Sequence, residues 1–405
     1  MGFAKGSTHP TGYAFPLNNT ASLEGRSYKA RSSREIFGMP HNRNQHFVPR
    51  CLLRPFTLGA DGAAINVFNI SRERPIWDAS VKSQCSRDYF YGRDGQVESV
   101  LAALEGDFAK LLKKLQNGDM PNEDEKRRLM LFVLVQWRRT AATIKEMKLQ
   151  HEDFKNKVFA EHEEQRHELD LTHNELVAIS MKMGVEMLKY ALDLKIAIFL
   201  NKSSTDFVIS DNPSVLTNRL HLQRWNDRNF GVSNSGAIFS LPLGPRFSFI
   251  AYDRSAYTIA NSSEFVEMKK DADVSALNEL QMLSAAENIY FSQRNSSDKI
   301  AELLRASGDE RQEPTFRNTM LILHSETGEN KTYRVANPDE QKAANLTHTE
   351  LLSRKPRRWT SQLSFRSKIK TFSNGSSVGH VRKEEWLSGG PPGRPFRFNP
   401  PATSV

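Results

Sequence analysis

The placement of apolar residues limits what this chain can fold into more than any other feature of its sequence. Apolar side chains recur at helical or strand spacing from about residue 44 to residue 352, whereas both ends are rich in Gly, Ser, Pro and Arg. A segment without such spacing has no continuous apolar face to bury. The sequence therefore predicts a disordered lead over residues 1–43, a single globular domain over residues 44–352, and a basic disordered tail over residues 353–405.

The positive charge of the chain is concentrated in this tail. Lys and Arg number 56 against 47 Asp and Glu, a net charge of +9. The tail holds 11 basic and 2 acidic residues, an excess of nine, so the 45 basic and 45 acidic residues before it cancel. Its cations are interspersed with Trp and Phe, a composition that can bind nucleic acid through charge and stacking, or an anionic membrane surface. The alternative is an extension that serves only solubility.

Cysteine content and the length of apolar runs indicate the cellular compartment in which the protein is expected. Cys51 and Cys85 are the two cysteines, too few for a disulfide framework or a cysteine-only zinc site, and both are expected to be small buried residues. The N-terminus has no apolar leader segment, and no apolar run approaches the ~18 residues of a membrane span. We therefore expect a cytoplasmic protein without a transmembrane segment, and the sequence leaves its oligomeric state open.

Periodicity predicts the fold class. Apolar residues at three- and four-residue steps predict long helices, and β-branched and aromatic runs beside Gly, Pro and Asn predict short strands. The expected fold is α+β and mainly α-helical, with long helices packed against a small sheet of a few strands. Helices are expected over about residues 96–118, 121–148, 172–200 and 273–290. Strands are expected within residues 46–68, 205–210, 237–253 and 318–336.

The first motif that bears on chemistry is the segment Asn44–Arg50, NQHFVPR. Pro49 favours an extended Val48, and in a strand the side chains of His46 and Arg50 project from the same face. A His and an Arg on one face could hold a phosphate or a carboxylate. The alternative is an ordinary strand with a hydrogen-bonded His and an ion-paired Arg.

The second motif is the segment Phe207–Pro213, FVISDNP, in which a strand leads into a polar turn. A rigid strand can aim the polar groups at its end, so Asp211 is the candidate metal ligand or general base. Asn212 precedes a proline and is expected to be extended beside it. The alternative is a local turn in which both side chains bond nearby backbone amides.

The third motif is Gln136–Thr140, QWRRT, within an expected helix. Arg138 and Arg139 lie ~100° apart around that helix, so one of them could point inward and would then require a carboxylate or a bound anion. The alternative is a pair of arginines on the helix surface. The sequence contains no Walker A, dinucleotide-binding or nucleophile-elbow motif, so the common nucleotide-binding and serine-hydrolase signatures are absent.

The order of the motifs resembles the bacterial proteins grouped as domain of unknown function 4238. The segments that carry the resemblance, over about Asn44 to Arg294, are NQHFVPRCLLRPF, CSRDYFYGRDG, a helix bearing Glu105, LMLFVLVQWRRT, FVISDNP, AIFSLPLGPRFSFIAYD and LNELQMLSAAENIYFS. The resemblance implies a cytoplasmic, mainly helical protein with a few strands, and it names no reaction. Cys51 stands where the resemblance leads us to expect an aromatic residue, a departure that concerns packing rather than chemistry.

The resemblance marks four residues as motif positions: His46, Arg50, Asp211 and Asn212. We expect them in one cleft with Arg138 or Arg139, and with Asp88 or Glu105. Such a set suits phosphodiester or phosphate-ester hydrolysis, with His46 as acid and base, Asp211 as ligand of a divalent Mg or Mn ion, and arginines opposite the developing negative charge.

Two functional hypotheses follow from these motifs. The first is a metal-dependent hydrolase, a nuclease or phosphoesterase that acts on nucleic acid or nucleotides. The second is a non-catalytic binding or regulatory protein, in which the same polar residues form a buried structural network and the basic tail engages the partner.

Overall fold

The computed structural model describes residues 43–59, 61–158, 169–259, 264–327, 330–344, 346–376 and 378–387, together with His167 and three short terminal strands. Those strands are β1 (Ala4–Lys5), β2 (Ala14–Pro16) and β20 (Arg394–Phe398). Most of the predicted lead and the last part of the predicted tail therefore lie outside the described residues.

A five-stranded sheet contains the most deeply buried strands. Its order is β13-β7-β11-β10-β9, antiparallel throughout except for the parallel pair of β13 with β7. All seven residues of β10 are buried, because both faces of this strand are covered, and a strand covered on both faces is apolar along its length rather than alternating. The strands are β7 (Lys195–Asn201), β9 (Val215–Thr217), β10 (Ile238–Gly244), β11 (Phe247–Tyr252) and β13 (Phe265–Met268).

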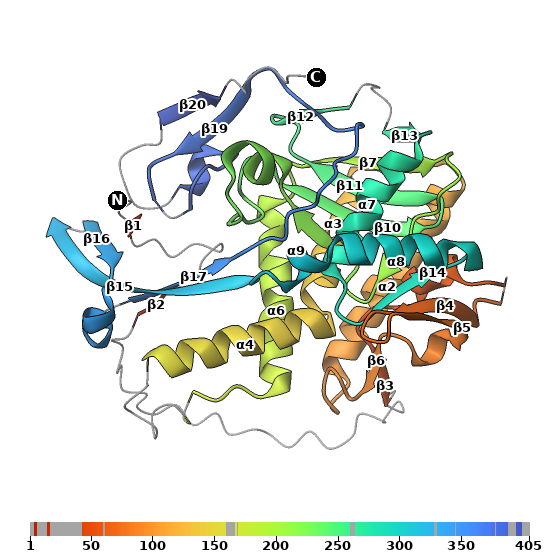
Figure 1. The fold of residues 1–405 in the computed structure, drawn as a ribbon, viewed down its shortest axis with the longest axis horizontal. Helices are drawn as coiled ribbons and strands as arrows, with labels where there is room; N and C mark the ends of the chain where they lie inside the picture. The colour runs from red at the N-terminus through yellow and green to blue at the C-terminus, as the bar shows by residue number, and fades with distance from the viewer. Residues whose placement is uncertain are drawn as a thin grey trace.

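Two further sheets and three two-stranded pairs complete the strand content of the described residues (Figure 1). A four-stranded sheet has the order β5-β4-β14-β8, and a five-stranded sheet has the order β1-β16-β15-β17-β2, whose β15–β16 hairpin projects from the body. The pairs are β3 with β6, β12 with β18, and β19 with β20.

The bounds of these strands are β3 (Asn44–His46), β4 (Ala64–Asn69), β5 (Arg74–Ser80), β6 (Ser86–Asp88), β8 (Ile209–Ser210), β12 (Tyr257–Thr258), β14 (Asn288–Phe291), β15 (Phe316–Thr327), β16 (Asn330–Val335), β17 (Leu346–Leu351), β18 (Ser364–Phe365) and β19 (Ile369–Ser373).

The predicted fold class, mainly α-helical with one small sheet, is therefore wrong. The fold is a mixed α/β arrangement in which several sheets share the interior with the helices. One source of the error is the segment KIAIFLN, which was expected to end a helix near Leu200 and instead forms β7. Short apolar runs suit a buried helix and a buried strand equally, and partners distant in sequence decide between them.

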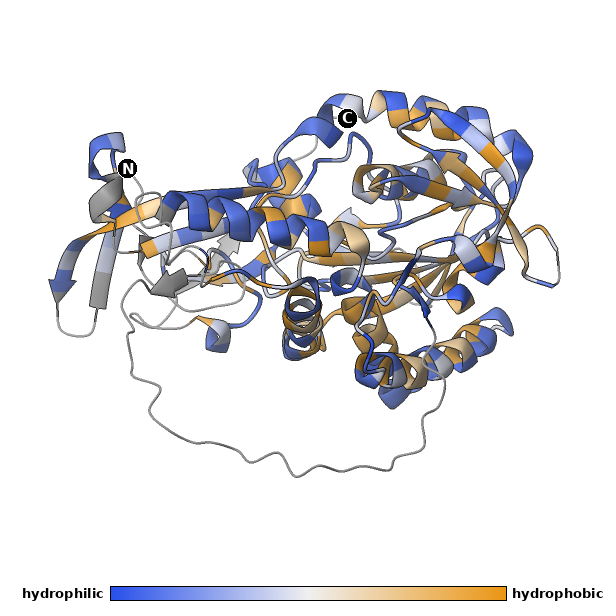
Figure 2. Cartoon of the chain, turned by 90° about the horizontal axis from the view of Figure 1, so that it is seen from below, coloured by the Kyte–Doolittle hydropathy of each residue, from blue (hydrophilic) through white to orange (hydrophobic). Residues whose placement is uncertain are grey.

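The helices follow the apolar periodicity more closely. They are α1 (Arg50–Leu53), α2 (Gln96–Gln116), α3 (Glu123–Arg138), α4 (Ala141–Val158), α6 (His173–Glu186), α7 (Asp271–Ser284), α8 (Ser297–Ala306) and α9 (Gly308–Gln312). Asn122 with Glu125, and Thr172 with Glu175, form capping boxes that begin α3 and α6. Figure 2 shows apolar colour gathered where helices meet the sheets. No helix among the described residues is long and apolar enough to cross a membrane.

The tail prediction is wrong for residues 353–387, since the described residues of this segment are packed against the body. Leu363, Ile369, Val381 and Trp386 are buried and belong to the same apolar clusters as the sheets and helices. Arg382 is 8% exposed, and its guanidinium donates to both carboxylate oxygens of Asp193 at 2.8 and 2.9 Å. Sequence composition missed this order because each anchor lies far along the chain from its partner.

Candidate functional site

The junction between α3 and α4 sends three consecutive side chains to three different places. Helix α3 ends at Arg138, and α4 begins at Ala141. Arg138 lies in a cavity beside the sulfur atoms of Met147 and Met183, at 3.2 and 3.8 Å from its Nη2. Arg139 and Thr140 turn instead toward the two other sequence motifs. The QWRRT motif is therefore a connecting point rather than one face of a continuous helix.

Arg139 joins the first motif through a buried polar network. Its side chain is fully buried, its Nη1 donates to Glu105 Oε1 at 2.8 Å, and its Nε donates to Gln136 Oε1 at 2.9 Å. The Nε2 of Gln136 donates in turn to the Phe47 carbonyl at 3.1 Å. The network thus fixes the backbone of the first motif, directly after β3, against α2 and α3.

His46 lies at the edge of this network. Its Nε2 atom is buried without a hydrogen-bond partner among the described residues. Burial, followed by the positive charges of Arg50 and Arg139, lowers the pKa of His46, so the imidazole is neutral at pH 7. Arg50 is exposed at the start of α1. Of the two candidate carboxylates, Glu105 contacts Arg139, whereas Asp88 pairs with Arg43 at 2.7 Å.

The carboxylate of Asp211 is occupied by the backbone of a turn. Its two oxygen atoms accept hydrogen bonds from the N–H groups of Ala286, Glu287 and Asn288 at 2.8, 2.7 and 3.1 Å. These residues connect α7 to β14. Burial raises the pKa of Asp211 in spite of these three bonds. The side chain therefore holds one secondary-structure connection to the end of β8.

The same bonds make Asp211 a poor ligand for a magnesium or manganese ion. Such a hard cation needs carboxylate oxygens that are free to coordinate it, and usually more than one carboxylate. Here both oxygens already accept bonds from donors that cannot move without the turn. Among the residues that the structure describes, no group of three or more His, Cys, Asp or Glu side chains is arranged to hold a metal.

Asn212 and Ser210 extend this second network to α7 and to the helix junction. Asn212 Oδ1 accepts from the Thr140 hydroxyl at 2.8 Å, and its Nδ2 donates to the Ser284 carbonyl at 3.2 Å. The Ser210 hydroxyl donates to Gln281 Oε1 at 2.9 Å. The structure therefore links Asn212 with Thr140 and places Arg138 and Asn212 on one cavity. His46 lies instead near Arg50 and Arg139, whose charges lower its pKa.

Neither cysteine is poised as a nucleophile. Burial raises the pKa of Cys51 to about 12, and it raises the pKa of Cys85 well above its ordinary value. Both thiols are therefore protonated at neutral pH.

A second candidate site is the segment Lys355–Lys370, hereafter the basic strip. It contains six basic residues and no acidic residue, and all six basic side chains are exposed. They are Lys355, Arg357, Arg358, Arg366, Lys368 and Lys370. None of them forms an ion pair with a carboxylate of a described residue.

The backbone of the basic strip is held in place by carboxylates. Glu310 of α9 accepts from the Lys355 N–H at 2.5 Å, and Glu279 of α7 accepts from the Arg357 N–H at 2.8 Å. Asp273 at the start of α7 accepts from the Ser361 N–H at 2.5 Å. Because these acidic groups bond the backbone, they fix the path of the strip across α7 without pairing its cationic side chains.

Two aromatic side chains of the basic strip lie against arginines from an earlier part of the chain. The guanidinium carbon of Arg219 is 5.9 Å from the ring centre of Trp359 and 4.8 Å from that of Phe365. The guanidinium of Arg224 is 4.8 Å from the same Phe365 ring. Both aromatic residues are partly exposed. Sequence reasoning missed Arg219 and Arg224, because no local pattern connects them to rings some 140 positions away.

Comparison with known proteins gives one match. A family model described as Protein of unknown function (DUF4238) matches residues 44–295. No curated protein and no solved structure matches the chain. The matched region contains both polar networks and the Arg219–Arg224 segment, and the basic strip lies outside it.

Proposed function

We propose that this chain, which belongs to the DUF4238 family of proteins of unknown function, binds single-stranded nucleic acid through the basic strip. The observation that carries the proposal is a row of six exposed cations without carboxylate partners, fixed in place by backbone bonds. Ordered cations lose less freedom on binding a polyanion than cations of a disordered tail do.

The aromatic residues favour a nucleic acid over a membrane surface. Trp359 and Phe365 lie beneath the guanidinium groups of Arg219 and Arg224, so neither ring is free to insert into lipid. A guanidinium beside an aromatic ring offers a planar cation on which an unpaired base can stack. Bases of a duplex are already stacked, and this argument therefore favours a single strand.

The polar motifs support binding rather than hydrolysis. Structural hydrogen bonds account for the side-chain positions of Arg139, Asp211 and Asn212, above all for Asp211 with its three backbone donors. His46, the acid and base of the hydrolase hypothesis, lies near Arg50 and Arg139 and is not among the hydrogen-bond partners of Asp211. The observations thus favour the non-catalytic reading of the motifs, with the C-terminal segment as the part that engages the partner.

Removal of three strip cations tests the proposal. In the variant Lys355→Gln/Arg358→Gln/Lys368→Gln, we expect affinity for single-stranded DNA or RNA to fall about 100-fold at about 0.1 M salt. The reason is that each lost phosphate contact makes the negative slope of log K against log salt shallower by ~0.7, and three lost contacts make it shallower by ~2. Fluorescence anisotropy of a labelled oligonucleotide over a salt series measures both quantities.

A matched control distinguishes the effect of the basic strip on affinity from the effect of net charge. Lys110→Gln/Lys113→Gln/Lys182→Gln removes three exposed cations from α2 and α6, and it should leave affinity nearly unchanged. Equal losses in the two triple variants would contradict a specific strip, as would binding only to vesicles of anionic lipid. Magnesium-dependent cleavage of the oligonucleotide by the intact protein would restore the hydrolase hypothesis.

A further inference from the structure

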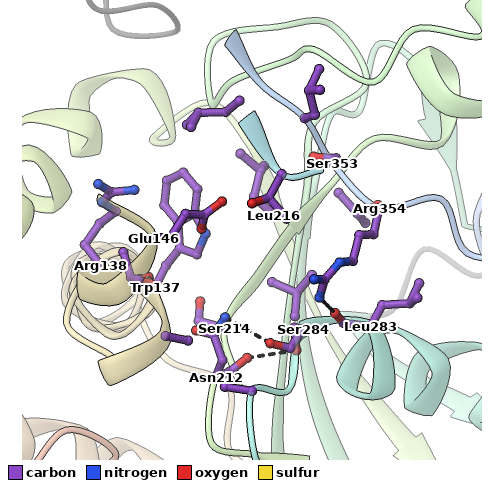
Figure 3. A pocket seen from close by; sticks show the side chains of 18 of the residues that line it. Trp137, Arg138, Glu146, Asn212, Ser214, Leu216, Leu283, Ser284, Ser353 and Arg354 are labelled. Carbon is purple, nitrogen blue, oxygen red and sulfur yellow. Dashed lines mark hydrogen bonds between the residues drawn. The ribbon is translucent and has the colours of Figure 1, made fainter. Parts of the chain in front are cut away.

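A cavity of about 390 Å³ lies beside the helix junction, and Arg138 lines it whereas Arg139 does not. It is lined by the start of α4, the C-terminal end of α7, β9 and the residues that precede the basic strip. Figure 3 shows Trp137, Arg138 and Glu146 on one side of the cavity, with Leu283 and Arg354 on the other. This volume falls in the range of sites for small organic molecules.

The charges around this cavity are unbalanced. Among the described residues that line it, Arg138, Lys145, Arg311 and Arg354 are basic, and Glu146 is the one acidic residue. Much of the remaining wall is apolar, with Trp137, Leu216, Phe230 and Leu280 among its members. A cavity with several cations, one carboxyl group and an apolar wall suits an anion that carries an apolar body.

Arg311 and Arg354 are held at the same end of the cavity by the last carbonyls of α7. The Nη1 of Arg311 donates to the carbonyls of Met282 and Ala285, the latter at 2.9 Å, and the Nη1 of Arg354 donates to the Leu283 carbonyl. Each of these bonds uses Nη1 alone, so the other N–H groups of each guanidinium remain for a bound anion. The Nε of Arg354 is buried and has no partner among the described residues.

Two guanidinium groups in this position repel one another. Burial, followed by the charge of Arg354, lowers the pKa of Arg311, and burial also lowers the pKa of Arg354. An anion between the two groups would relieve the repulsion and accept from the remaining N–H groups, which is the geometry that carboxylates and phosphates match.

We propose that this cavity binds a small organic anion, with a carboxylate or phosphate head between Arg311 and Arg354 and an apolar body against Trp137. The alternative, in which both arginines serve only to bond the end of α7, accounts for their Nη1 atoms but not for the open volume beside them. Arg311 and Arg354 follow the region matched by the family model, whereas Arg138, Asn212 and Ser284 lie within it.

Titration calorimetry on the full-length chain tests this site. The probes are benzoate, hexanoate, phenyl phosphate and inorganic phosphate, with benzyl alcohol as the uncharged analogue. We expect at least one organic anion to bind, and benzyl alcohol to bind at least about tenfold more weakly. The carboxylate and phosphate arms decide which head group is preferred, and inorganic phosphate shows whether the apolar body contributes.

Two variants locate the bound anion. Ala142→Phe fills the cavity from α4 and should weaken binding at least about tenfold, whereas Ala103→Phe, on an exposed face of α2, should not. Arg354→Gln should weaken binding by about 10- to 100-fold, the loss of a charged hydrogen-bonding partner. Three results would overturn the proposal: no organic anion bound at about 10 mM, equal binding of anion and alcohol, or unchanged binding by folded Ala142→Phe.

The pH dependence of binding gives a further prediction. The groups that act on Glu146 are Arg138 of α3, Thr315 and Arg354. The other charged residues that line the cavity are Arg311 and Lys145. Burial raises the pKa of Glu146, although Thr315 and the two arginines favour its charged form. Below this raised value the carboxyl group is neutral, and above it the negative charge competes with the ligand for Arg354. Affinity should therefore fall as pH rises through it.

Benzenesulfonate is the suitable probe for this series, because its own charge does not change with pH. Its affinity for the unmodified chain should decline with rising pH, and the decline should disappear in Glu146→Gln, which resembles the neutral acid. The same decline in both proteins would show that another group is responsible.

Discussion

A chain that ends at Ser353 is expected not to fold, whereas a chain that ends at Leu387 should unfold in the same cooperative transition as the full-length protein. The segment between them buries Leu363, Ile369, Val381 and Trp386 within the main apolar clusters. At about 1.5–3 kcal/mol for each such side chain, their loss amounts to roughly 6–12 kcal/mol, against a total stability of about 5–15 kcal/mol for a typical protein.

Polar contacts add to this loss. Removal of Arg382 takes away the bidentate partner of Asp193 and the donor to the Val232 and Asn234 carbonyls at 2.6 and 2.8 Å. Circular dichroism and urea unfolding of the two shortened chains provide the measurement. A soluble chain ending at Ser353, with the near-ultraviolet spectrum and unfolding midpoint of the intact protein, would show that the segment merely lies on the surface.

The contrast between helices and tail shows what a single sequence can and cannot predict here. The capping box of Thr172 and Glu175 and the apolar face of α2 are encoded within a few turns of helix, and both are present in the fold. The order of residues 353–387 depends on distant partners, such as Asp193, which pairs with Arg382 almost 190 positions later in the chain. Its composition is basic and polar, and composition alone does not predict contacts with residues so distant in the sequence.

The same distinction between local and distant information applies to the candidate site. The sequence leaves open whether one of Arg138 and Arg139 points inward or both lie on the helix surface, and the structure buries both, in different surroundings. It expected the motifs to meet in one cleft, because polar residues at strand and helix ends often do. The break in the helix at Arg139 and Thr140 separates them instead. No sequence pattern predicts Arg354 and Glu146, since neither lies in a motif and they meet only through the fold.

The replacement Asp211→Ala is expected to destabilise the protein by at least about 3 kcal/mol rather than to silence a folded one. It leaves the N–H groups of Ala286, Glu287 and Asn288 without their acceptor. A hydrogen bond contributes about 1 kcal/mol, and more when the acceptor is charged, so three lost bonds amount to roughly 3 kcal/mol or more. Asp211→Asn keeps one oxygen for these donors but places an amide N–H₂ against another, so an intermediate loss is expected. Urea unfolding monitored by Trp fluorescence measures both variants.

A metal-binding or general-base role for Asp211 predicts instead that Asp211→Ala loses function while its stability is retained. A carboxylate whose oxygens are kept free for a cation holds no turn in place, so its removal would leave stability nearly unchanged or raise it. The control is Glu287→Ala, which removes an exposed carboxylate from the same turn and should alter stability by no more than about 0.5 kcal/mol. If Asp211→Ala and Glu287→Ala were equally mild, the turn would not depend on Asp211. The hydrolase hypothesis would then regain its central residue.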